Sequence, residues 1–289
     1  MTSLVVRNLR LFFRDRLNVF FSLLSGLVLF FLYTLFLARL QVDGLVATLP
    51  GVGRGDLEAF VDSWMLSGIV LLTTVTSGIG AVSTFVEDRA SGRFADFLVA
   101  PIRRHHLVLG YLLSSVLVAV VMSSVIFVLS VLYLGLARGA WLQPLDLLGG
   151  VGAMLLCCAA FTAIGAFGAS FLKTTGAYSA FATVVGTVLG FIAGSYIPVG
   201  SLPSAVASVV NALPFAQGAM LLRRPFTADT LAAVTGSDPE GMAGLREFYG
   251  IDLFVGTGEV TSLMALGVLV IVSLGFSALS AARIRSLLR

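Results

Sequence analysis

The side chains that could do chemistry are few, and they gather at the edges of long apolar runs. The two histidines, His105 and His106, are adjacent, as are the two cysteines, Cys157 and Cys158. Neighbouring residues on a helix do not face each other, which argues against a structural disulfide or a metal site. Intramembrane proteases need a histidine or two aspartates inside a span, and only Asp146 comes near one. The pattern therefore argues against a polytopic enzyme.

An ATP site is also missing from the sequence. A P-loop needs the pattern G-x-x-x-x-G-K-[ST], whose glycines bring the backbone close to the phosphates. The single lysine, Lys173, is followed by Thr174, but Leu172 precedes it and Phe167 stands where the first glycine belongs. Ion-coupled transporters usually carry ionisable residues at membrane depth, and the apolar runs hold essentially none. If the chain transports, its energy comes from a separate ATPase subunit.

The apolar runs predict the helices that must position any functional residues. Of the 289 residues, 58% are hydrophobic and 11% are charged, against about a quarter charged in a soluble domain. A block of about 18 apolar residues is long enough to cross a bilayer as a helix. We predict an all-α polytopic membrane protein, a single transmembrane domain over 1–289. The six predicted spans are 17–38, 64–86, 107–136, 145–172, 177–197 and 260–282.

The segments outside these spans have their own character. Residues 1–16, MTSLVVRNLRLFFRDR, are either an interfacial helix or a plain positively charged flank. In 198–259, three prolines (Pro198, Pro203 and Pro214) cut an apolar stretch into pieces too short to span, which favours re-entrant or interfacial helices. The polar residues 227–259 are either an ordered external cap or a flexible loop.

Basic residues predict the orientation. The N-terminus, the loop 87–106, Lys173 and the C-terminus together hold 12 of the 18 basic residues and 4 of the 15 acidic ones. Cytoplasmic segments carry the excess of Arg and Lys. Both termini and the loop 87–106 are therefore predicted to be cytoplasmic, with loops 39–63, 137–144 and 198–259 outside. The net charge of +3 follows from this topology and gives no reason to expect nucleic acid.

The loop sequence EDRASGRFADFLVAPIRR, residues 87–104, is unusually rich in charge. Ser91 is suited to cap a short helix from about Gly92 to Ala100, and Pro101 would end it. Phe94, Phe97 and Leu98 would share one face of that helix. Such a helix fits a groove on a partner protein, or it covers the ends of neighbouring spans. The residues alone leave both readings open.

This loop resembles the cytoplasmic loop between spans two and three of permeases of type 2 ABC exporters. The matching positions are Glu87, Arg89, Gly92, Phe97-Leu98 and Ala100-Pro101-Ile102. The six spans, the N-terminal helix, and the proline-rich run followed by Arg223 resemble the family as well. Arg93 stands where a small hydroxyl residue is common, and Phe97 replaces a usual leucine. These departures put details of the partner contact in doubt.

The resemblance implies how such a chain works. It implies a second permease subunit, surrounding membrane lipids, and two ATP-binding cassette subunits that hold ATP and magnesium, with no cofactor on this chain. The loop would be the coupling helix that contacts the ATPase. The contact residues expected on this basis are Glu87, Arg89, Ser91, Gly92, Arg93, Phe94, Phe97, Leu98 and Pro101.

The expected function is the permease subunit of an ATP-driven exporter in a bacterial cytoplasmic membrane. An amphipathic, drug-like or lipid-like substrate is expected, because the spans lack buried charge. Export of a polysaccharide or glycolipid is the alternative within the class. A membrane scaffold without transport is the alternative outside it.

Two further patterns lie inside the spans. Gly186, Gly190 and Gly194 are spaced four apart, which lets helices approach closely, either across a dimer or within the subunit. The second span is rich in hydroxyl side chains. They are expected either to line a substrate path or to bond to their own backbone carbonyls. The residues considered for the path are Thr73, Thr74, Thr76 and Ser77.

Overall fold

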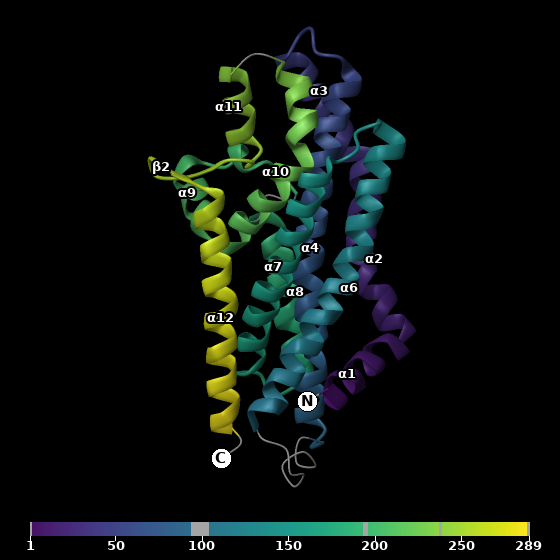
Figure 1. The fold of residues 1–289 in the computed structure, drawn as a ribbon, viewed down its shortest axis with the longest axis vertical. Coiled ribbons are helices and arrows are strands. Elements are labelled where there is room, and N and C mark those ends of the chain that lie inside the picture. Colours follow the sequence, from purple (N-terminus) through teal and green to yellow (C-terminus); the bar gives the residue numbers. More distant parts are fainter. Residues whose placement is uncertain (1, 94–103, 193–195, 237–238, 288–289) are drawn as a thin grey trace.

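A computed structural model describes residues 2–93, 104–192, 196–236 and 239–287 of the chain. It is 85% helical with one two-stranded sheet, which confirms the prediction of an all-α polytopic membrane protein. Long helices run side by side along the vertical axis of Figure 1. We call one end, with α1 and the last turn of α12, the termini end; the other, with α3, α11 and the hairpin, is the cap end (Figure 1).

The N-terminal part holds an oblique helix and a long broken one. Helix α1 (Thr2–Arg14) buries one stripe of side chains and exposes Val6, Leu11 and Phe13, as an interfacial helix would. After it, α2 (Arg16–Leu32), the π-helical turn η1 (Tyr33–Leu37) and α3 (Ala38–Thr48) follow one another directly. The predicted loop 39–63 is therefore helical at both ends, because the next helix already begins at Arg54 and α3 continues to Thr48. Polar residues such as Arg39 do not break a helix, and this one continues until Pro50 and Gly51 turn the chain.

Three long helices form the centre. They are α4 (Arg54–Ala90), α6 (Arg104–Arg138) and α7 (Pro144–Ala169). Helix α4 contacts α2, α3, α6, α7, α8 and α10. The most apolar window of α4 is 78% buried, against 11% for that of the C-terminal helix. Helix α4 is therefore the core around which the other helices pack.

The remaining elements build one side and the cap. They are α8 (Thr175–Ile192), η2 (Val199–Ser201), α9 (Ser204–Ala212), α10 (Pro214–Thr235), α11 (Pro239–Phe248), β1 (Leu253–Val255), β2 (Gly258–Val260) and α12 (Ser262–Leu287). The strands pair antiparallel, with Leu253 opposite Val260 and Gly256 at positive φ in the turn. The segment 227–259 thus forms an ordered cap over the part that the structure describes.

The described residues contain five helices long and apolar enough to cross a membrane. They lie in Val19–Thr48, Arg54–Ala90, His106–Arg138, Pro144–Ala169 and Ser262–Ile284. A sixth candidate is the pair α9 and α10, which bends by 86° at the break before Pro214. The predicted span 177–197 corresponds to the shorter apolar helix α8, and residues 193–195 of it lie outside the described part.

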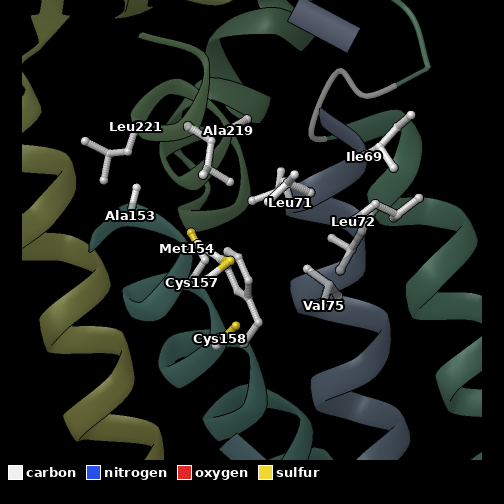
Figure 2. Packing of buried hydrophobic residues seen from close by; sticks show 14 of the residues in the cluster. Ile69, Leu71, Leu72, Val75, Ala153, Met154, Cys157, Cys158, Ala219 and Leu221 are labelled. Carbon is white, nitrogen blue, oxygen red and sulfur yellow. The ribbon is translucent and has the colours of Figure 1, made fainter. Parts of the chain in front are cut away.

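The apolar core lies where α4, α7 and α10 meet (Figure 2). Ile69 and Leu71 on α4 are buried together with Cys157 on α7. A Cβ added at Gly218 of α10 would lie 3.0 Å from Cys157 Sγ. Small residues therefore let these three helices approach closely.

Candidate functional site

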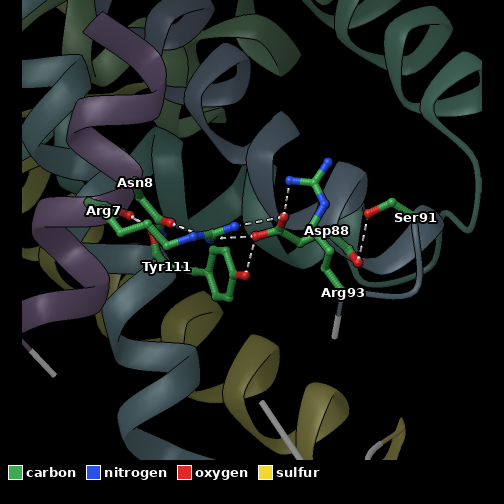
Figure 3. A network of polar contacts seen from close by, with 7 residues as sticks. Arg7, Asn8, Asp88, Ser91, Arg93 and Tyr111 are labelled. Carbon is green, nitrogen blue, oxygen red and sulfur yellow. Dashed lines mark hydrogen bonds and ion pairs between the residues drawn. The ribbon is translucent and has the colours of Figure 1, made fainter. Parts of the chain in front are cut away.

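A buried aspartate lies in the last turn of α4, at the termini end. Asp88 is 1% exposed, and four donor atoms surround its carboxylate (Figure 3). Arg7 Nη1 and Nη2 donate to its two oxygens at 2.7 and 3.1 Å, which makes a bidentate pair. The Tyr111 hydroxyl donates at 2.6 Å and Arg93 Nη1 at 3.2 Å. A buried carboxylate needs such partners to remain charged.

Helix α1 is positioned to bring Arg7 to this carboxylate. Leu4 is buried where α1 packs on α6, and a Cβ added at Gly110 would lie 2.6 Å from Leu4 Cδ2. On the next turn Asn8, also buried, donates through Nδ2 to Ser114 Oγ on α6 at 3.1 Å. The hydrogen bond to Asp88 raises the pKa of Arg7, against the opposing effect of partial burial. We call Arg7, Asn8, Asp88, Arg93, Tyr111 and Ser114 the Asp88 network; it ties α1, α4 and α6 together.

The neighbouring loop residues belong to the same end of α4. Arg89 Nη1 donates to the carbonyl oxygens of Ser170 and Leu172, at 3.3 and 3.4 Å, just after α7 ends. An arginine here satisfies carbonyls that a helix end leaves open. Glu87 is exposed and lines a cavity described below. Arg89 thus adds α7 to the helices held around the end of α4.

Ser91 and Gly92 differ from the sequence prediction. Ser91 is the C-cap of α4, and its hydroxyl donates to the Asp88 carbonyl oxygen at 3.4 Å. Gly92 has φ +78°, a left-handed conformation that ends a helix rather than begins one. The prediction of a helix that starts at Gly92 with Ser91 as its N-cap is therefore wrong at that end. Phe94, Phe97, Leu98 and Pro101 lie outside the described residues, and their coupling role stays a prediction.

A long groove runs along α4 between α8 and the α1–α2 corner. Its part near the termini end has a volume of about 620 Å³ and is lined by Asp15, Glu87 and Ser179 among others. A second cavity of about 630 Å³ continues it between α2, α4 and α8. The two cavities share the lining residues Gly80, Ser179 and Ala182, so we treat them as one groove. Its lining mixes charged, hydroxyl and apolar side chains.

The hydroxyl-rich stretch of α4 relates only in part to this groove. Thr73, Thr74 and Ser77 are buried, and each donates to a carbonyl oxygen three or four residues earlier in α4. Thr76 also donates, to Leu72 O at 3.0 Å, but it is partly exposed and lines the groove. Of the four residues considered for a substrate path, only Thr76 lines this groove.

The three glycines spaced four apart in the predicted fifth span also differ in their surroundings. Gly186 lines the groove, and a Cβ there would lie 3.6 Å from Thr76 Cγ2. Gly190 is buried against the ring of Tyr196 in the same chain, where a Cβ would clash. Packing within the subunit thus accounts for Gly190. Gly194 lies outside the described residues.

A second charged cluster lies at the cap end. Asp252 accepts from Arg246 Nε at 2.6 Å and from Arg224 Nη2 at 2.6 Å. Partial burial disfavours the ionised Asp252 carboxylate, but the two arginines together outweigh it and lower the pKa of Asp252. Close by, Arg223 is buried over the Trp64 ring, and the Trp64 indole donates to the Tyr249 carbonyl oxygen at 2.8 Å. These contacts fix the cap to α4.

Metal chemistry finds no support in the described part of the chain. There, no group of three or more histidine, cysteine or acidic residues is placed to hold a metal ion. Cys157 and Cys158 are free and buried.

Sequence reasoning missed Asp88 and Arg7, the centre of the network. One signal was available: Ala81, Phe85 and Asp88 follow helical spacing on the buried face of α4, so a charge continues an apolar stripe. An ionisable residue on such a face needs a partner. The sequence does not say which of 17 arginines that partner is.

The comparison with protein families gives one match. A family model described as "ABC-2 type transporter" matches residues 1–226, which include the Asp88 network and the groove. No curated protein matches the chain.

Proposed function

The chain belongs to the ABC-2 type transporter family and is the membrane permease of an ABC transporter; on that premise we propose that it exports an amphipathic molecule. The family implies an ATP-binding partner subunit. Transport would be outward, with an amphipathic molecule as the substrate. ATP and magnesium would bind to the partner subunit. The termini end would lie on the cytoplasmic side of a bacterial inner membrane.

The groove is the observation that carries this proposal. Its two parts have volumes of about 620 and 630 Å³, within the range of ligand sites. Near the termini end the lining is polar, with Asp15 and Glu87; farther along it combines Phe21 with hydroxyls such as Thr76 and Thr187. A molecule with both apolar and polar parts finds partners along this whole length.

The groove also supports a second permease subunit. It is open along one side, and the helices beside it expose Phe21 (60%), Val184 (60%) and Val188 (46%). A second copy facing this side would close the two grooves into one path. We propose a permease dimer with two ATP-binding subunits at the termini end, where the Asp88 network holds α1, α4 and α6.

Gly80 offers the sharpest test, because it lies where the two cavities meet. A Cβ at Gly80 has no atom within 4 Å, so the side chain of Gly80→Phe starts in open space where the two cavities meet. The matched control is Gly267→Phe on α12, which is exposed and equally open. Both variants are reconstituted with the ATP-binding subunit that co-purifies with the wild-type chain, and ATP-driven movement of the dye rhodamine 6G and of a fluorescent phospholipid is measured.

We expect at least a tenfold loss of transport in Gly80→Phe, with transport in Gly267→Phe close to wild type. Equal transport in the two variants would remove the groove as the path. Transport of a glycolipid but of neither probe would favour the polysaccharide or glycolipid branch. A wild-type complex that moves none of these compounds would favour a scaffold.

A further inference from the structure

A separate cavity, which shares no lining residue with the groove, lies between α2 and α6 in the membrane-spanning part. It has a volume of about 410 Å³. Gly26, Ile126 and Ser130 form its buried floor, while Phe31 and Leu129 stand exposed at its rim. The Ser130 hydroxyl donates to the Ile126 carbonyl oxygen at 2.8 Å and is thereby satisfied. The cavity, which we call the α2–α6 slot, therefore presents an apolar surface.

The length of the slot matches one leaflet of a bilayer. Its lining on α6 extends from Ile126 to Ala137, which at 1.5 Å per residue is about 16 Å. Half of a hydrocarbon core of about 30 Å is about 15 Å. At the inner end of the slot, Gly26 lies against the Thr73 hydroxyl, and Thr73 is near the middle of α4. The slot thus begins near the membrane centre and runs toward the cap end.

The outer end of the slot is marked by groups that favour the membrane interface. Tyr133 lines the slot with its ring and donates its hydroxyl to Asp62 Oδ2 at 3.3 Å. Arg138, one residue beyond the lining, pairs with Asp62 at 2.6 Å and with Glu58 at 2.5 Å. Trp141 packs beside Gly135 on the same turn of the chain. Aromatic and charged side chains of this kind gather where hydrocarbon gives way to headgroups.

The chemistry of the slot favours an apolar occupant. Over its length of about 16 Å the lining is apolar, apart from the Ser130 hydroxyl, which bonds to the backbone, and the Tyr133 hydroxyl, which bonds to Asp62. A single extended hydrocarbon chain is narrow, apolar and always present around this surface.

We propose that the α2–α6 slot binds one acyl chain of a phospholipid from the leaflet at the cap end, with its headgroup beside Arg138 and Trp141. The lipid would keep α2 and α6 at a fixed separation. The proposal rests on the slot alone and is independent of what the groove transports.

The test fills the slot and counts bound lipid. Ser130→Phe places a ring on the floor, and Ala137→Phe places one at the exposed outer end, where folding is not at risk. The matched controls are Ser277→Phe and Ala278→Phe on α12. Each full chain is purified in mild detergent from membranes that contain palmitoyl-oleoyl phosphatidylcholine, and native mass spectrometry measures the phospholipid retained per chain. A phosphatidylcholine with a photoreactive acyl chain end then locates the site.

We expect one phospholipid retained by wild type and by both controls, and at least a fivefold lower bound fraction in both slot variants. The photoreactive chain end is expected to label α2 near Gly26 or α6 near Ile126. Equal retention in slot and control variants, or labelling elsewhere, would overturn the proposal. Retention of an apolar metabolite in place of phospholipid would also overturn it. So would slot variants that lose the dimer while wild type binds no lipid.

Discussion

Two aspartates at opposite ends of the molecule are each held by two arginines, yet they join different things. Asp88 binds Arg7, 81 residues away on α1, together with Tyr111 on α6. Asp252 binds Arg246 and Arg224, 6 and 28 residues away, within the cap and the helix that leads to it. The first cluster ties separate helices together, whereas the second closes one compact segment.

This difference suggests that the two ends of the molecule have different mechanical roles. A carboxylate that is 1% exposed and shared by three elements resists any movement of one element without the others. The Asp88 network would therefore transmit a push on α1 or on the end of α4 to the helices that line the groove. The Asp252 cluster would keep the cap in one shape while the spans move.

The largest predicted effect comes from removing Asp88. Asp88→Ala leaves Arg7 and the Tyr111 hydroxyl without their acceptor, and breaking a buried pair costs about 3 kcal/mol. We expect a clear fall in the thermal unfolding midpoint in detergent. The adjacent exposed Glu87→Ala is the control and should be nearly neutral. Similar midpoints for the two variants would show that the network does not hold the helices.

A smaller effect is predicted for Asp252→Asn, about 1–2 kcal/mol, because this side chain is partly exposed. The lowered pKa of Asp252 sets the sign of the pH dependence. The stabilisation is full above the unfolded-state pKa of about 4 and is lost as the pH falls through the lower, folded-state pKa. Chemical unfolding from pH 7 to pH 2 should show wild type and variant converging at the acid end. A constant difference over this range would contradict the ion pairs.

The smallest effects should separate two threonines of α4. Thr74 and Thr76 both donate to backbone carbonyls, but Thr76 alone lines the groove. Thr76→Val should change the apparent affinity for a transported probe several-fold, whereas Thr74→Val should leave it unchanged. Concentration-dependent transport rates measure this. A larger change from Thr74→Val would move the substrate path away from the groove.

Much of the fold was predictable, because long apolar blocks have few options in a membrane. The predicted apolar blocks lie within or close to α4, α6, α7 and α12, although α4 begins at Arg54, ten residues before the predicted span 64–86. The continuation of the first span into α3 was not predicted, since Arg39 and Asp43 are compatible with both a loop and a helix leaving the membrane.

The site was less predictable than the fold. The loop 87–104 was identified, yet Asp88 was overlooked, because its importance comes from Arg7 and Tyr111, which the sequence does not place beside it. The burial of Thr73, Thr74 and Ser77 also depends on which face of α4 meets its neighbours. Hydrophobic periodicity shows which residues share one face of a helix. In a nearly all-apolar helix it does not show which face packs against neighbouring helices.

The central claim is that the termini end receives the ATPase while the cap end does not. Hydrogen–deuterium exchange of the full chain, with and without its partner ATP-binding subunit, measures this directly. The account predicts that the ATPase slows exchange in peptides covering residues 2–14 and 87–106, and leaves peptides covering 239–260 unchanged. Protection of the cap peptides, with none at residues 87–106, would contradict it.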